Sequence, residues 1–309
     1  MNLKNYYLNK NETVSTRQSR RDSLVTIMNQ FNLQLGSKHT PTLFAIPQSD
    51  QYQTISGLIS KPHAKTSEDK LWNNKLLFTD TKTNISFQQQ PKVINQKINP
   101  DWIMRDYSSR LIKEYSYLLK SNKFINGQDL RIKKIIDELK IVPIKDMSLL
   151  KIINSLYIYT LNNLTYGQPI DGLYSYDQAL TNKVTDCGGF STLLLSLLQS
   201  VNIPARLVVG FFIKDKNIFQ KILKTLNFEL LTFNFLSMHV WVEVLLPDKT
   251  WFPLDPAIEW RKSRGLTKRQ GGFGIIPADR LVLSYGQDFK IPIKGNVISV
   301  DILQKPITI

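Results

Sequence analysis

The chain's only cysteine lies where a loop enters a predicted helix. Residues 190–201 form an apolar run that predicts this helix, and Cys187 stands just before it, followed by Gly188 and Gly189. A helix N-terminus presents unpaired backbone N–H groups and the positive end of the helix dipole, which stabilise a thiolate and can hold an oxyanion. The two glycines would leave room for a substrate backbone beside the sulfur. This segment therefore predicts a nucleophilic thiol.

A lone cysteine is more often a small buried side chain than a catalyst, so Cys187 needs support from the rest of the sequence. His239, one of three histidines, opens an alternating run over 239–246 that predicts a strand. A second apolar run, 251–254, ends at Asp255. The two runs predict a hairpin that brings the imidazole and this carboxylate together.

The order of these motifs resembles that of the transglutaminase-like superfamily of papain-related cysteine enzymes. Its recurring pattern is a cysteine at a helix start, a stretch like residues 201–210, then His-x-Trp-x-Glu and Trp-x-x-x-Asp-Pro. Each part occurs here in that order, within residues 149–257. The resemblance implies an α+β, transglutaminase-like (papain-like) catalytic domain with the cysteine helix packed on an antiparallel sheet. It also implies a catalytic triad of Cys187, His239 and Asp255.

In such a triad the Cys187 thiolate would attack an amide or ester carbonyl. His239 would protonate the leaving amine and then activate the incoming water or amine, and Asp255 would fix the imidazole tautomer. Because of the helix start and the nearby imidazole, we expect the pKa of the thiol to lie well below the ~8.5 of a free cysteine.

The oxyanion of the tetrahedral intermediate needs hydrogen-bond donors, and the backbone N–H of Cys187 is the first of them. Family members often carry an aromatic or amide residue upstream, which makes Tyr166 the first candidate for a second donor and Gln168 the next. A tyrosine at a helix end is more often a packing residue, so this role stays open. Gly188 is expected to line the substrate cleft.

Alternation along the histidine strand places Trp241 and Glu243 on the face that carries His239. Trp241 could wall the cleft or pack in the core, and the sequence leaves both possibilities open. Glu243 is expected to form a structural ion pair with Arg206. Asp186 is expected to cap the cysteine helix.

The length of 309 residues and a hydrophobic content of 42% predict two domains. Residues 1–98 predict an immunoglobulin-like β-sandwich that serves as a scaffold or docking surface, and residues 99–309 predict the catalytic domain. Residues 214–237 predict a helical insertion, either a lid or a packed surface hairpin. The expected strands of the first domain are 24–28, 42–46, 76–78 and 84–87, and the expected helices of the second are 107–119, 130–139 and 148–164.

The net charge of +15 supports a rival hypothesis, a nucleic-acid-binding protein. The basic residues are mostly scattered, however, and no aromatic-interleaved RNA motif or zinc-ligand cluster occurs. We therefore expect no nucleic-acid partner, no metal and no cofactor. The stretch 261–269 holds five cations and no acid, and it could face an anionic substrate near the cleft or be a solvated loop.

The first functional hypothesis is hydrolysis of amide bonds in a peptide or protein substrate through a Cys187 thioester. Transamidation is the second, and a non-catalytic binding module, which an intact triad argues against, is the third. Transamidation needs a channel with aromatic walls, and the sequence offers Trp241 but no second tryptophan near the cysteine. Without a secretory signal or an apolar run of membrane-spanning length, the default expectation is a cytoplasmic protein, with export by another route left open.

Overall fold

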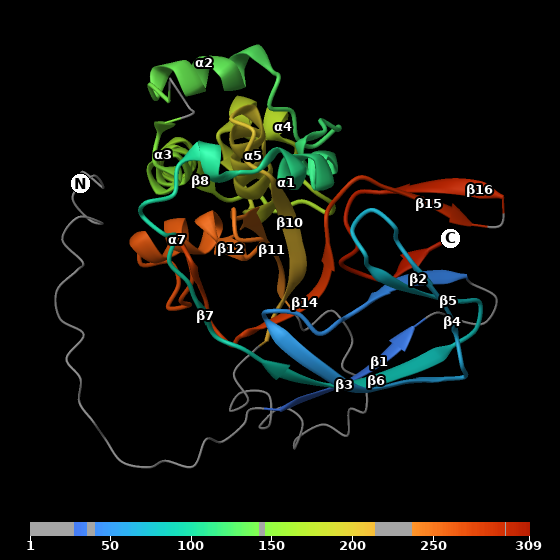
Figure 1. Ribbon diagram of the computed structural model, residues 1–309. Coiled ribbons are helices and arrows are strands. Elements are labelled where there is room, and N and C mark those ends of the chain that lie inside the picture. Colours follow the sequence, from blue (N-terminus) through green and yellow to red (C-terminus); the bar gives the residue numbers. More distant parts are fainter. Residues whose placement is uncertain (1–27, 36–40, 142–145, 214–236, 294) are drawn as a thin grey trace, which may run out of the picture.

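The computed structural model describes residues 28–35, 41–141, 146–213, 237–293 and 295–309. A group of helices covers one end of the molecule and strands dominate the other (Figure 1). A four-stranded antiparallel sheet of the order β12-β11-β10-β14 links the two ends. Its strands are β10 (Ala205–Phe212), β11 (Ser237–Leu245), β12 (Trp251–Leu254) and β14 (Arg280–Tyr285).

The two faces of this sheet pack on different partners, because successive side chains of a strand alternate. Val240, Val242 and Val244 share a core with the leucines of helix α5 (Cys187–Ser200). Trp241 belongs to a second core, which it shares with Tyr52 of the N-terminal region. Helix α5 is buried almost throughout, which makes it the central helix of this part.

The other helices surround α5. The predicted helix over 107–119 divides into a short α-helix and a 3-10 turn, whereas those over 130–139 and 148–164 each form one helix. The helices are α1 (Ser109–Glu114), α2 (Leu130–Glu138), α3 (Leu149–Asn163), α4 (Tyr176–Asn182) and α7 (Pro256–Ser263), with 3-10 turns η2 (Met104–Asp106) and η3 (Ser116–Leu119).

A β-rich region precedes the helices, as predicted. One sheet has the order β1-β6-β3 and the other β17-β2-β5-β4, and apolar side chains from both meet in one core. The expected strands at 42–46, 76–78 and 84–87 are confirmed by β2, β5 and β6, while residues 24–27 lie outside the described residues. The bounds are β1 (Asn29–Leu35), β2 (Thr42–Ile46), β3 (Gln53–Lys61), β4 (Lys65–Glu68), β5 (Lys75–Thr79), β6 (Thr83–Pro91) and β17 (Ile307–Thr308).

Strand pairs connect the two parts of the chain. The C-terminal strand β17 pairs with β2, and β13 (Ile275–Ile276) pairs with β7 (Ile94–Asn95). Phe211 and Leu281 of the central sheet enter the core between the two N-terminal sheets. A division into domains at residues 98 and 99 stays a prediction, and these contacts cross it.

The chain returns to the central sheet through its C-terminal end. A hairpin of β15 (Phe289–Ile293) and β16 (Asn296–Val300) precedes a tail whose Gln304 donates to the carbonyl oxygens of Gly210 and His239. The short strands β8 (Thr165–Tyr166) and β9 (Val184–Thr185) form a parallel pair before α5. Among the described residues, no helix combines the length and apolarity needed to cross a membrane.

Candidate active site

Cys187 is the first residue of α5, and the local sequence explains why the helix begins there. Asp186 is the N-cap, and its Oδ1 accepts from the backbone N–H of Gly188 at 2.8 Å. The cap satisfies one of the unpaired N–H groups of the first turn and favours the helix start in spite of two glycines. The expected capping role of Asp186 is confirmed. The thiol is half-buried at the helix entry.

The hairpin of β11 and β12 brings His239 and Asp255 together, as predicted. Val242 pairs with Leu254, so Asp255 follows the end of β12 within reach of the imidazole. The Nε2 of His239 lies 2.8 Å from Oδ2 of Asp255, and both side chains are buried. Asp255 also caps α7, because its Oδ1 accepts from the N–H of Ile258 at 3.1 Å. The hairpin of β11 and β12 and the start of α7 therefore both fix this carboxylate.

The sulfur of Cys187 lies against the start of β11. The backbone N–H of Val240, the residue after His239, donates toward it. Because Nε2 of His239 is engaged by Asp255, Nδ1 is the ring nitrogen left to exchange a proton with the thiol. Among the residues that the structure describes, no hydrogen bond joins this sulfur directly to the ring.

The pKa of the thiol differs from the expectation. Burial, followed by the nearby carboxylates of Asp186 and Asp255, raises the pKa of Cys187 to about 12, although the N–H groups of Val240 and Cys187 itself oppose this. The predicted low pKa is therefore wrong for this arrangement. Burial also lowers the pKa of His239, against the pull of Asp255. Near neutral pH the thiol and the imidazole are thus both uncharged.

This charge state predicts how Cys187 reacts with iodoacetamide. Between about pH 6 and pH 9 the alkylation rate should rise about tenfold per pH unit without a plateau, because the thiolate fraction grows by that factor below the pKa. Cys187 is the only cysteine, so mass spectrometry of the intact chain reports its labelling alone. A plateau below about pH 8 would instead indicate a resting thiolate–imidazolium pair.

Arg280, which sequence reasoning missed, is the second partner of Asp255. Its Nη1 lies 2.7 Å from the same Oδ2 that faces His239, and its side chain is only 1% exposed. Burial alone would raise the pKa of Asp255, but His239 and Arg280 hold it well below its usual range. The guanidinium lies near two aromatic rings, 5.0 Å from that of Trp241 and 5.2 Å from that of Phe212. A signal existed in the sequence: an arginine that opens an otherwise apolar strand.

The basic stretch 261–269 is tied to this site. Arg269 pairs with Asp279 at 2.8 Å and covers the ring of Phe212 at 4.3 Å. At the other end, Arg261 lies 4.8 Å from the ring of Tyr166. The two ends of the stretch therefore contact Tyr166 and Phe212, which itself stacks on His239, while its middle is exposed.

Tyr166 lies near the thiol, as its predicted role requires. It pairs with Thr185 through the β8 and β9 ladder, and its ring packs on Phe190 at 6.3 Å. Burial and the nearby Cys187 raise the pKa of its hydroxyl. Gln168 is exposed, and its backbone carbonyl accepts from Tyr174 at 2.8 Å. The oxyanion roles of Tyr166 and Gln168 stay predictions.

The glycines after Cys187 are required by packing. A Cβ on Gly188 would come within 2.9 Å of Asp186 and 3.0 Å of Leu173, and one on Gly189 would overlap Thr185. The space beside both glycines is therefore filled by the protein's own atoms. A direct role of Gly188 in the substrate cleft stays a prediction.

Trp241 and Glu243 both support the sheet. Trp241 is fully buried, and its Nε1 donates to the hydroxyl of Tyr52 at 3.2 Å. Its ring stacks on that of His239 at 5.9 Å, so it backs the imidazole instead of walling an open cleft. The predicted ion pair of Glu243 with Arg206 is confirmed at 2.6 Å. Within the described ranges, no group of three or more potential metal ligands occurs.

Residues 142–256 match the family model of the Transglutaminase-like superfamily. A search of the curated proteins found no match to this sequence. Among solved structures, the fold is similar to that of a candidate cysteine protease from Cytophaga hutchinsonii, with 15% sequence identity and a TM-score of 0.51. The similarity covers 91% of this chain and 93% of that chain, so both share one fold over most of their length.

Two further solved structures are similar over smaller shares of the two chains' lengths. The periplasmic domain of TgpA from Pseudomonas aeruginosa is 14% identical, with a TM-score of 0.44 over 81% of this chain and 75% of that chain. A transglutaminase from red sea bream is 13% identical, with a TM-score of 0.30 over 75% of this chain and 48% of that chain.

Proposed function

We propose that this chain, which belongs to the transglutaminase-like superfamily through residues 142–256, is a cysteine hydrolase of amide bonds in peptides or proteins. The observation that supports this most is the buried contact of 2.8 Å between His239 Nε2 and Asp255 Oδ2, beside a cysteine at a helix N-terminus. A nucleophile, a base and a group that orients the base are the parts that acyl transfer through a thioester requires.

Acylation would begin with a proton transfer. With Nε2–H donated to Asp255, Nδ1 of His239 accepts the thiol proton as the sulfur attacks the substrate carbonyl. The N–H of Gly188 already donates to Asp186, so the N–H of Cys187 is the helix donor available to the oxyanion. The imidazolium then protonates the leaving amine, and the carbon–nitrogen bond breaks to leave a thioester.

Deacylation would reverse the roles. His239 removes a proton from water, the oxygen attacks the thioester carbonyl, and the sulfur leaves and regains the proton. In both steps a positive imidazolium forms in a buried site, where Asp255 stabilises it. We infer that Arg280 is a positioning residue, because it keeps the Asp255 carboxylate ionised and fixed in place without facing the substrate.

The structure favours hydrolysis over transamidation on one point. Trp241 is buried behind the imidazole and cannot wall a channel for an amine. Tyr166 is then an aromatic residue close to the thiol, because Cys187 acts on its pKa. Transamidation remains the second candidate, since it shares the thioester and differs only in the acceptor.

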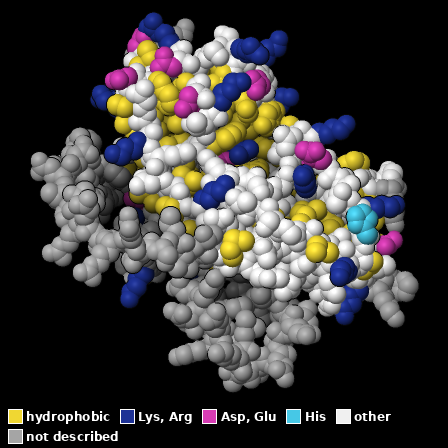
Figure 2. Space-filling view, turned by 60° about the horizontal axis from the view of Figure 1, so that its bottom comes forward, with side chains coloured by type: hydrophobic (Ala, Val, Ile, Leu, Met, Phe, Trp, Pro, Cys, Tyr) yellow, Lys and Arg dark blue, Asp and Glu magenta, His cyan; other side chains and the backbone are white. Residues whose placement is uncertain are grey.

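A scaffold role of the N-terminal region also has support, because Tyr52 hydrogen-bonds Trp241, and Gln51 donates to Glu243 at 2.5 Å. Both contacts lie on the strand that carries His239. Lysine and arginine side chains are scattered over the face shown in Figure 2, with fewer acidic ones among them.

The proposed outcome can be tested with a library of glutamine-containing peptides and an excess of a labelled primary amine. We expect cleavage or deamidation to exceed amine incorporation, because Trp241 lies behind the imidazole and supplies no wall for an amine channel. Mass spectrometry follows both products, and Cys187→Ala is the blank. Incorporation of the amine above hydrolysis would favour the transamidase, and equal product from the blank would refute an enzyme of this mechanism.

A further inference from the structure

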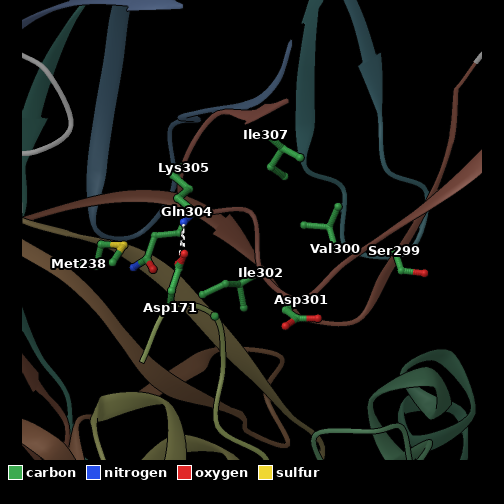
Figure 3. A pocket seen from close by; sticks show the side chains of 10 residues that line it. Asp171, Met238, Ser299, Val300, Asp301, Ile302, Gln304, Lys305 and Ile307 are labelled. Atoms are coloured by element: carbon green, nitrogen blue, oxygen red, sulfur yellow. Dashed lines mark hydrogen bonds and ion pairs between the residues drawn. The ribbon is translucent and has the colours of Figure 1, made fainter. Parts of the chain in front are cut away.

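A cavity of about 310 Å³ lies beside the triad and takes no part in the chemistry described so far. Three segments that are distant in sequence line it (Figure 3): a loop before α4, the start of β11, and the end of β16 together with the C-terminal tail that follows it. The lining residues are Asp171, Gly172, Met238, Ser299, Val300, Asp301, Ile302, Gln304, Lys305 and Ile307.

Backbone contacts place this cavity between the supports of the two catalytic side chains. Met238 directly precedes His239, and Gln304 donates to the carbonyl oxygen of His239 at 3.3 Å. On the other side, the N–H of Ile170 donates to Asp186, the cap of the cysteine helix, at 3.3 Å. The cavity therefore adjoins the segments that hold His239 and Cys187 in place.

The charges in the cavity compensate one another. Asp171 pairs with Lys305 at 2.6 Å across it, and Asp301 pairs with Lys123 at 2.5 Å. Each acidic group thus has a basic partner, and no unpaired charge is available to select a charged ligand.

The uncharged side chains of the lining are mostly apolar, with Ser299 and Gln304 as the polar exceptions. Val300, Ile302 and Ile307 are partly buried, whereas Met238 is 47% exposed. Ile170, which adjoins the lining at Asp171, is 38% exposed. Large apolar side chains left open to water beside a catalytic centre favour binding of an apolar group, since covering them removes apolar surface from water.

We propose that this cavity binds a large apolar side chain, of leucine or phenylalanine type, in the peptide or protein substrate, close to the carbonyl that Cys187 attacks. The inference rests on the proposed function, because it assigns a specificity to the same site. It concerns residues of the C-terminal tail, which lie outside the part that matches the family model.

Methyl NMR tests this binding without turnover. The chain has five methionines, so labelling their ε-methyl groups gives a simple spectrum in which Met238→Leu identifies the reporter. In the full chain with Cys187→Ser, N-acetyl-leucinamide and N-acetyl-phenylalaninamide should shift the Met238 signal saturably. N-acetyl-serinamide and N-acetyl-lysinamide should not. Equal or absent shifts with all four amides would overturn the proposal.

Filling the cavity provides the second arm. Ile302→Trp should abolish the shift of the Met238 signal. It should also reduce the preference for apolar residues in the cleaved peptides at least about tenfold. Val297→Trp, on the exposed face of β16, is the control and should change neither the shift nor the preference. The other methionine signals report whether the variant keeps its fold. An unchanged preference would refute the subsite while leaving the hydrolase intact. A saturable shift without any Cys187-dependent turnover would refute the hydrolase, and the substrate subsite with it.

Discussion

Alanine in place of His239 should lower Cys187-dependent hydrolysis at least about 10⁴-fold, the scale on which triads respond to loss of their base. The thiol of Cys187 has a raised pKa, so it depends on a neighbouring base to lose its proton during attack. Alkylation of Cys187 by iodoacetamide should keep its rise with pH, because the resting thiol is already uncharged, so this rate reports that the site is still folded. Both rates are measured on the same preparation by mass spectrometry.

A matched control separates this effect from the loss of any imidazole. His63 is exposed in the N-terminal region, so His63→Ala removes the same group without touching the site. The control should keep both rates. If His239→Ala retained hydrolysis within about tenfold of the wild type, the base would be another residue and the triad assignment would be wrong.

The contacts that sequence could predict are local ones. Asp186 caps a helix that begins at the next residue, and His239 meets Asp255 across a short hairpin. Such arrangements depend on alternation, turn formers and capping residues, which are visible within about 20 positions. The register of β10 with β11 also placed Arg206 opposite Glu243, as their predicted ion pair requires.

The contacts that sequence could not predict depend on distant segments. Trp241 was a candidate cleft wall, but Tyr52 of the N-terminal region meets it from the buried side of the sheet. A helix start, which is visible in sequence, predicts a low pKa for the Cys187 thiol, whereas the burial that dominates this pKa comes from tertiary packing. The cavity beside the triad likewise needs the C-terminal tail, whose return to β10 and β11 no local pattern encodes.

Arg280 is a further such case, since β14 reaches Asp255 only because it pairs with β10. Replacing it with methionine should reduce turnover about 10²- to 10³-fold and cost about 3–5 kcal/mol of unfolding free energy, because it leaves a buried carboxylate with one partner fewer. Arg280→Lys should restore part of the turnover and part of the unfolding free energy, since it keeps the charge but loses the planar group near Trp241 and Phe212. Arg110→Met, at an exposed arginine, is the matched control.

The pH dependence distinguishes a positioning role from a purely structural one. The pKa of Asp255 is held low in the folded chain. Its ionisation therefore stabilises the fold at pH values above the unfolded pKa of ~3.9. This contribution is lost as the pH falls through the pKa of Asp255 in the folded chain. Without Arg280 the folded pKa rises, and the acid loss of both stability and turnover should move to higher pH.

A double-mutant cycle shows whether Arg280 acts through Asp255. If it does, Arg280→Met should cost little further turnover in an Asp255→Asn chain, because the carboxylate that it orients is already gone. Thermal unfolding across pH and the pH–rate profile are measured for all four chains. Two outcomes would contradict the positioning role: a folded Arg280→Met chain with the wild-type pH–rate profile, or a loss of turnover that simply adds to that of Asp255→Asn. Either would show that the guanidinium supports only the packing of β14. His239 would then hold the carboxylate alone.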